Sequence, residues 1–232
     1  MIPGKVPAEN IQKDFIEILN CLYKAAQHYD DEVLLFADPV HQVHNNENDY
    51  CWQLKGTANT KTALANTGRR RLNIIGAINA LTLQPVIMLT EENCCTEVME
   101  AFLEEIKEQY PTAKTICIVL DNARYQRAYA VQQKAKELNI ELLYLPPYCP
   151  NLNLIERLWR FFKKKVMKNK YYETFASFEN TVEQFFVNFN DNFEALKTVL
   201  SFKFGIIKAS WYTNSINSSR LYNSLLWRIM LR

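Results

Sequence analysis

The run Thr115–Leu120 most constrains the fold of this chain, because it is apolar almost without interruption and Asp121 ends it abruptly. A strand that is covered on both faces has this pattern, and the pattern is typical of parallel sheets. Helical spacing follows in Ala128–Leu138, and a second apolar run occupies Ile140–Leu145. Strand, helix and strand joined by short links predict parallel pairing within an α/β sheet.

The segments on either side of this unit predict further elements and one main domain. The strands expected upstream suggest an antiparallel run, and they are Val33–Ala37, Cys51–Gly56, Leu72–Ile78 and Pro85–Leu89. Helices are expected within residues 1–30, from an N-cap at Asn93 to Pro111, and over 175–189 and 193–200. We therefore expect a linker and lead-in helix in residues 1–30, one domain over 31–204 and a separate tail over 205–232.

The stretch Leu145–Arg160 predicts a stiff turn that opens a helix. Its prolines restrict the loop, and Asn151 or Asn153 can cap the helix that follows. The expected core face of that helix is made by Ile155, Leu158, Trp159, Phe162 and Val166. Glu156 stands beside this face in the first turn, so the turn aims its carboxylate. The alternative is an ordinary ion pair between Glu156 and Arg160, which contributes only about 0.2–0.5 kcal/mol.

Three carboxylates are expected at the ends of elements: Asp38 after the first strand, Asp121 after the central run, and Glu156 at a helix start. Open α/β sheets bind ligands at the carboxyl ends of their strands, so these acids can converge. Clustered carboxylates repel and raise one another's pKa unless divalent cations neutralise them. Mg²⁺ or Mn²⁺ suits this role, and two such ions support in-line phosphoryl displacement without a covalent protein intermediate.

The formal net charge is only +2, but basic residues are concentrated in two acid-free segments, Tyr50–Thr90 and Arg157–Lys170. Either segment alone could be a solvated surface. If both lie near one acidic pocket, they would bind the phosphates of a nucleic acid. Arg124 could bind a phosphate or pair with a nearby acid. The residues predicted to contact DNA are Lys55, Arg69, Arg70, Arg71, Arg124, Arg157, Arg160, Lys163 and Lys164.

Cysteine and histidine usage predicts neither a disulfide framework nor a zinc site. The cysteines show no CxxC spacing, and we expect all of them to be reduced: Cys21, Cys51, Cys94, Cys95, Cys117 and Cys149. His41 and His44 fall in a stretch that Pro39 and Asn45 mark as a loop, with no further ligands at zinc spacing. No apolar run approaches the ~18 residues of a membrane span, and no apolar signal region opens the chain. An intracellular protein without membrane contact is expected.

Four motifs carry a resemblance to a known family. They are Phe36–Asp38, Arg70–Ile78, Leu120–Tyr125 and Leu145–Trp159. Together they resemble the catalytic domain of the mariner-related insertion-sequence transposases of the DDE superfamily, over roughly residues 7–204. The 34 residues between Asp121 and Glu156 are also the interval that this group uses.

The resemblance implies an RNase H-like fold, with a mixed sheet of antiparallel first strands and then parallel strands, flanked by helices. It implies that Asp38, Asp121 and Glu156 are catalytic and bind two Mg²⁺ or Mn²⁺ ions. The implied reaction is cleavage of transposon ends by water and strand transfer by the released 3′-OH. The implied partners are double-stranded transposon and target DNA, with a homodimer allowed, in the nucleoid of the cytoplasm.

Two other functions are compatible with the same fold and basic segments. Family members carry an N-terminal helix-turn-helix region, and this chain begins at about the linker after it, so specific recognition of transposon ends is not expected. That difference favours a catalytically silent remnant or DNA-binding fragment. A nuclease of the RNase H type is the second alternative. The intact set of three carboxylates favours chemistry, and metal-dependent nicking of DNA would distinguish an active chain from a silent one.

Overall fold

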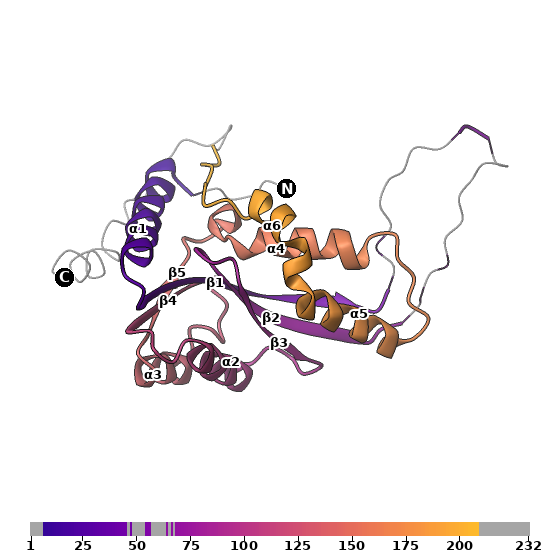
Figure 1. The fold of residues 1–232 in the computed structure, drawn as a ribbon, viewed down its shortest axis with the longest axis horizontal. Coiled ribbons are helices and arrows are strands. Elements are labelled where there is room, and N and C mark those ends of the chain that lie inside the picture. The colour runs from indigo at the N-terminus through magenta and orange to yellow at the C-terminus, as the bar shows by residue number, and fades with distance from the viewer. Residues whose placement is uncertain are drawn as a thin grey trace.

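The computed structural model describes residues 7–45, 47, 54–56, 64, 66 and 68–208. Within these residues one sheet has five strands in the order β3-β2-β1-β4-β5 (Figure 1). The strands are β1 Glu32–Val43, β2 Arg71–Asn79, β3 Pro85–Thr90, β4 Thr115–Leu120 and β5 Ile140–Tyr144. The β1–β2 and β2–β3 pairs are antiparallel, whereas β1–β4 and β4–β5 are parallel. The predicted mixed sheet is confirmed, and the strand expected at Cys51–Gly56 falls mainly outside the described residues.

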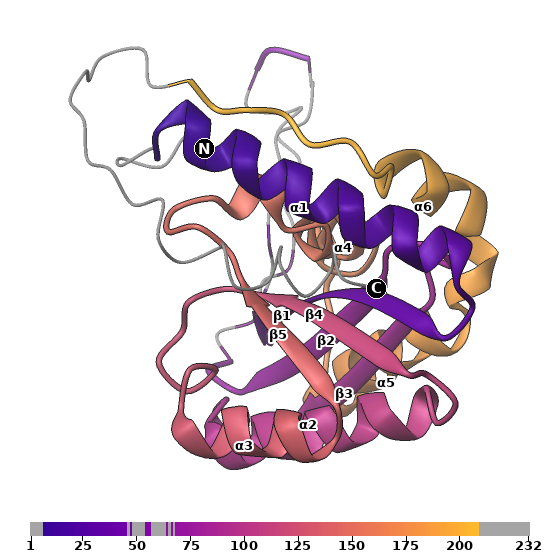
Figure 2. The same cartoon turned by 90° about the vertical axis from the view of Figure 1, so that its left-hand side faces the viewer.

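Helices cover both faces of the sheet. The helices are α1 Glu9–His28, α2 Thr96–Gln109, α3 Tyr129–Glu137, α4 Ile155–Phe162, α5 Phe175–Val187 and α6 Phe193–Val199. Figures 1 and 2 show α2 and α3 on one face, and α1, α4, α5 and α6 on the other. No helix in the described part of the chain has the length and apolar character needed to cross a bilayer.

Two apolar clusters fill the spaces between the sheet and its helices. In β4, Cys117 and Val119 face the cluster that includes α1 and α4, whereas Ile118 and Leu120 face α2 and α3. Successive residues of a strand point to opposite faces, and both faces of the sheet are covered here, so all four side chains are buried. The expectation that this run is covered on both faces is confirmed. Phe15 of α1 lies in the same cluster as the sheet, so this helix shares the main core.

Strand β1 is longer than its sequence pattern indicates. The prediction that the first strand ends at Asp38 is wrong, because β1 continues to Val43. Pairing with β4 stops at Phe36, but antiparallel pairing with β2 holds the backbone extended beyond that point. Pro39 is tolerated there because β1 has become an edge strand, where a missing N–H costs little.

The histidines expected in a loop also lie in or beside this strand. His41 belongs to β1, and its Nδ1 lies 2.6 Å from Oδ1 of Asn73 on β2. His44 is buried after the strand end, with its Nε2 2.8 Å from the carbonyl oxygen of Tyr172. Both rings therefore have partners within the fold. The loop expected here is wrong for His41, which lies in β1, whereas His44 follows the strand in a bend.

The predicted helix caps are also wrong. Helix α2 has Cys95 at its N-cap, and Asn93 instead contacts the guanidinium of Arg71. Helix α4 has Leu154 at its N-cap, after a 3₁₀ turn over Pro150–Leu152. Asn151 and Asn153 use their amides to bind other segments, as described below. These tertiary partners replace the local caps, and local sequence does not reveal them.

Candidate active site

The structure brings the three predicted carboxylates to one pocket of about 560 Å³. Asp38 comes from the middle of β1, Asp121 follows β4 directly, and Glu156 lies in the first turn of α4. The last β1–β4 pair joins Phe36 and Val119, so Asp38 in β1 and Asp121 just after β4 each lie two residues beyond that pair. Both acids therefore lie just beyond the end of the parallel β1–β4 ladder, where they line the same pocket.

Asp38 reaches the pocket on the face of the sheet that α4 covers. It alternates in β1 with Phe36 and Val40, which belong to the same cluster as Leu158 and Trp159 of α4. Side chains two residues apart in a strand share a face, so Asp38 points toward α4. Asp38 is only partly buried, and its carboxylate is accessible from the pocket.

The electrostatics of the pocket agree with this convergence. Burial raises the pKa of Asp38 well above its usual value, and the charges of Glu156 and Asp121 raise it further. Burial also raises the pKa of Glu156; Arg160 and Lys163 oppose that change, and Asp121 adds to it. Carboxylates raise each other's pKa only when they are close enough to repel. Repulsion between carboxylates, as expected from the sequence, therefore contributes to the raised pKa of Asp38 and to that of Glu156.

These residues fit a divalent cation by their chemistry. In the described part of the chain, no three Asp, Glu, His or Cys side chains form a group that could hold an ion as they stand. Asp38, Asp121 and Glu156 nevertheless line one pocket, and the charges of Asp121 and Glu156 raise the pKa of Asp38. Carboxylates that share a pocket without a cation repel one another. Carboxylate oxygens are the ligands that Mg²⁺ and Mn²⁺ prefer, and a cation would relieve the repulsion.

Short polar contacts fix the loop ends around Asp121. The Oδ1 atom of Asp121 accepts a hydrogen bond from the backbone N–H of Ala123 at 2.9 Å, which orients the carboxylate. The amide of Asn122 donates to the carbonyl oxygen of Leu145 at 2.5 Å. The N–H of Leu145 in turn donates to Leu120 at 2.8 Å. The proline-rich turn is therefore tied to the end of β4.

A close approach between Gly76 and Trp159 sets the distance of α4 from the sheet. Gly76 pairs with Asp38 across the β1–β2 ladder. A Cβ atom at Gly76 would lie 2.6 Å from Cη2 and 2.9 Å from Cζ2 of Trp159. Trp159 follows Glu156 by three residues, so the ring packs against the strand beside Asp38. Sequence reasoning assigned Trp159 to the core but missed this contact, although a glycine inside an apolar strand is a signal for close approach.

Other residues that line the pocket were also missed as site residues. Tyr148 lines it in a left-handed conformation, with φ 62°, which is unusual for an aromatic residue. Asn153 lines the pocket and is buried; its amide donates to Ala37 at 3.4 Å, and its Oδ1 has no hydrogen-bond partner in the described structure. Its sequence position suggested only a helix cap.

The predicted DNA contacts divide into three groups. Arg160 and Lys163 lie with Asp38, Glu156 and His41 around a second pocket of about 340 Å³. These two cations are therefore beside the carboxylates. Lys55, Arg69, Arg124 and Lys164 form the second group; they are exposed and line neither of these two pockets.

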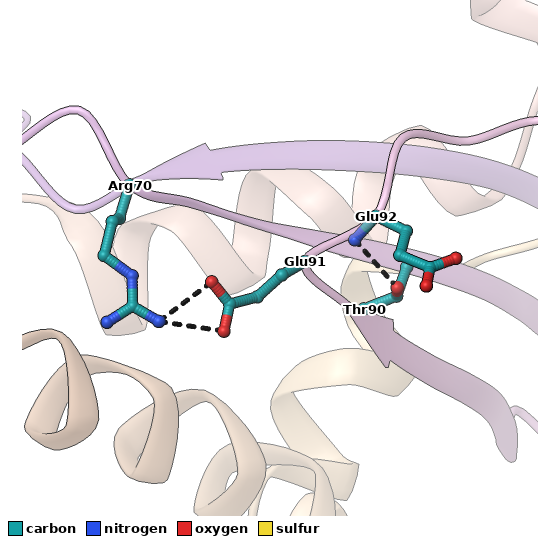
Figure 3. A network of polar contacts seen from close by, with 4 residues as sticks. All are labelled: Arg70, Thr90, Glu91 and Glu92. Atoms are coloured by element: carbon teal, nitrogen blue, oxygen red, sulfur yellow. Dashed lines mark hydrogen bonds and ion pairs between the residues drawn. The ribbon is translucent and has the colours of Figure 1, made fainter.

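Three predicted contacts are engaged within the protein. Arg70 pairs with Glu91 at 2.8 Å (Figure 3) and lies over the ring of Phe175, with 3.9 Å to the centroid. Arg71 contacts Asn93. The guanidinium of Arg157 donates to the carbonyl oxygens of two residues near the C-terminal end of the described chain.

Comparisons with known proteins agree with this arrangement. Residues 33–179 match the family described as DDE superfamily endonuclease. An uncharacterised 39 kDa protein of insertion element IS630 from Shigella sonnei is 25% identical over 142 residues, which are 61% of this chain and 38% of the relative. An uncharacterised protein of Sinorhizobium fredii is 31% identical over 83 residues, which are 35% of this chain and 58% of the relative. The chain thus spans less than two thirds of the length of either relative.

Solved structures share the fold. The Mos1 transposase paired-end complex with the left transposon end superposes with a TM-score of 0.63 at 15% identity, over 88% of this chain and 66% of that one. The catalytic domain of Mos1 mariner transposase superposes with a TM-score of 0.60 at 13% identity, over 86% and 93%. Paired-end complexes of Mos1 with Mn and with Mg also match. The likeness confirms the RNase H-like fold expected from the motifs.

Proposed function

Because the chain belongs to the DDE superfamily endonucleases, we propose that it is the catalytic domain of a transposase that cleaves transposon ends and transfers the strand. The observation that carries this proposal is the meeting of Asp38, Asp121 and Glu156, from three separate elements, in one pocket. The resemblance of the motifs to mariner-related transposases supports the substrate, as does the insertion-element origin of one relative.

In this proposal the three carboxylates hold two Mg²⁺ or Mn²⁺ ions. When bound, such ions generate a nucleophile from water and stabilise the charge on the attacking and leaving oxygens of a phosphoryl group. The side chains and backbone of the protein would bind the ions and orient the carboxylates. The N–H of Ala123 orients Asp121, while Gly76 and Trp159 hold Glu156 next to the strand that carries Asp38. Burial of the pocket strengthens each electrostatic contact.

Arg160 and Lys163 have the best position to bind a DNA phosphate, because they border the carboxylates in the second pocket. Exposed Lys55, Arg69, Arg124 and Lys164 would contact the backbone further away. Such contacts depend on charge and not on sequence. We further propose double-stranded transposon and target DNA as the substrates, a homodimer as the assembly, and association with the nucleoid.

The decisive experiment is nicking of supercoiled plasmid by the full chain in Mg²⁺ or Mn²⁺. We expect Asp121→Asn to lower the nicking rate by a factor of ~10² or more, because it removes a charge that binds the metal. Asp191→Asn is the matched control, since Asp191 is exposed and outside both pockets. Equal rates for the parent and Asp121→Asn would contradict the proposal.

Supplying a DNA end with a free 3′-OH and a target plasmid separates the remaining functions. Joined product supports strand transfer. Nicking without joining would favour a nuclease of the same fold, and no nicking by the parent chain would favour the catalytically silent fragment.

A further inference from the structure

The residues that follow α6 form an extended strap along α1. Figure 2 shows this segment, residues 201–208, running beside the length of α1 toward the N-terminal end of that helix. Phe202, Phe204 and Ile206 are partly buried, whereas Ser201, Lys203 and Gly205 between them are exposed. An extended chain with one packed face alternates in this way, because its side chains point to opposite sides in turn.

Two contacts fix the direction of the strap. The ring of Phe202 stacks on Tyr23 with 3.9 Å between centroids, and Ile207 bonds to Gln12. The helix rises by roughly 16 Å between these two positions at about 1.5 Å per residue. The strap covers the same distance of roughly 16 Å at about 3.3 Å per residue. The strap therefore lies antiparallel to α1 along three turns of that helix.

Gln12 binds the strap as a second backbone would. Its Nε2 donates to the carbonyl oxygen of Ile207 at 2.9 Å, and its Oε1 accepts from the N–H of Ile207 at 3.0 Å. The Nε2 atom also donates to Pro7 at 3.1 Å. Gln12 is fully buried, so loss of these bonds would leave buried polar groups unpaired.

The strap also binds the loop and the helix that position Glu156. Asn151, in the proline-rich turn, donates from Nδ2 to the carbonyl oxygen of Gly205 at 2.8 Å. Arg157, the neighbour of Glu156, donates from Nη1 to Ser201 and from Nη2 to Lys203, at 2.5 Å each. The Arg157 guanidinium also lies over the ring of Phe204, with 5.3 Å to its centroid. The first turn of α4 is thus anchored from outside the sheet.

We infer that Arg157 and Gln12 are positioning residues, which act through the strap to hold the Glu156 carboxylate toward Asp38. Arg157 was expected to bind DNA, but its guanidinium is engaged by two carbonyl oxygens of the strap. The inference rests on the proposed metal site, because its consequence is the affinity for the cation. Partners that orient a metal ligand contribute about 10-fold to 100-fold in metal affinity.

The test measures Mn²⁺ binding to the full chain by calorimetry and hydrogen exchange of the amides in 145–162. Arg157→Met keeps the apolar stem of the side chain and removes both strap bonds. We expect it to raise the Mn²⁺ dissociation constant about 10-fold and to speed exchange in α4 and the preceding turn. Gln12 bonds to the strap at Ile207, whereas Arg157 is the direct neighbour of Glu156. Gln12→Met should therefore change the Mn²⁺ dissociation constant and the exchange rates in the same direction but by less.

Two control variants separate positioning from general destabilisation. Lys134→Met removes a partly buried cation that pairs with Glu104, on the opposite face of the sheet. Leu103→Ala destabilises the core of that opposite face. Neither should change Mn²⁺ affinity or speed exchange selectively in 145–162. If Arg157→Met does not fold, Arg157→Lys, which can keep one of the two bonds, takes its place.

The inference is overturned if both strap variants bind Mn²⁺ within twofold of the parent and exchange no faster in 145–162 than Leu103→Ala. If the parent itself binds no Mn²⁺, the proposed metal site fails, and the exchange measurement alone then decides whether the strap holds α4. Faster exchange confined to 145–162 in the strap variants supports the inference in that case.

Discussion

The face of the sheet under α2 and α3 is packed by apolar side chains from helices close in sequence to the strands they cover, such as Leu103 and Ile106. The face under α1 and α4 is apolar too, but buried polar groups there join segments far apart, and the Gln12–Ile207 bonds span 195 residues. Apolar contacts stabilise without direction, whereas hydrogen bonds set positions. The α2/α3 face has directional contacts too, but its Asn79–Tyr110 bond spans only 31 residues. The longer-range bonds of Gln12 with Ile207 and of Asn153 with Ala37 lie on the face that carries the three carboxylates.

The largest expected difference between the faces concerns charge. Glu156→Gln keeps the side-chain volume and the helix start but removes a charge from the pocket. Plasmid nicking in Mg²⁺ should fall by a factor of ~10² or more, while the fold survives because repulsion with Asp38 is relieved. Glu104→Gln on α2 is the control and should nick at the parent rate. Undiminished nicking by Glu156→Gln would show that Glu156 is not a metal ligand and would favour its alternative role as an ion-pair partner of Arg160.

Close approach of α4 to the sheet should give the next largest effect. Gly76→Ala places a Cβ atom against Trp159, and we expect a loss of about 1–3 kcal/mol in the free energy of unfolding. Urea unfolding followed by circular dichroism measures this loss. Gly205→Ala is the matched control, because a Cβ atom there meets nothing within 4 Å, and its change should stay below ~0.5 kcal/mol. Equal losses in the two variants would refute the tight α4 contact.

Phosphate binding should also differ between the faces. Replacing Arg160 and Lys163 together by Gln removes two cations beside the carboxylates. The slope of log affinity for duplex DNA against log salt should become shallower by roughly 0.9 for each lost contact. Fluorescence anisotropy with a labelled duplex at several salt concentrations gives this slope. The double replacement of Lys134 and Lys136 by Gln on α3 should leave it unchanged, and an equal change there would mean that DNA has no preferred face.

The smallest effect is expected at a helix start. Thr174 and Ser177 form a reciprocal cap at the beginning of α5, with Oγ1 of Thr174 accepting from the N–H of Ser177 at 3.1 Å. Thr174→Ala should lower the free energy of unfolding by about 1 kcal/mol. Cys95, the N-cap of α2, makes no side-chain capping bond, so Cys95→Ala should cost less than ~0.5 kcal/mol in the same urea assay. A larger loss for Cys95→Ala would reverse this expectation.

The sequence by itself determined the mixed sheet and the identity of its central acids. Apolar runs and their periods located β2, β3, β4 and β5, because burial selects apolar residues at the spacing of each element. The acid after β4 and the acid after the proline-rich turn followed from the same patterns. The motifs also identified the family, which the match over residues 33–179 confirms.

Only the tertiary structure decided how these parts hold the site. Asp38 lies inside β1 because β2 continues to pair with that strand, and a neighbouring strand is not visible in local sequence. Arg157 binds the strap although its basic segment suggested DNA. The contacts of Gly76 with Trp159 and of Gln12 with Ile207 join residues that are distant in the chain. Periodicity records which side of an element is buried, but the partner on that side is chosen only when the whole chain packs.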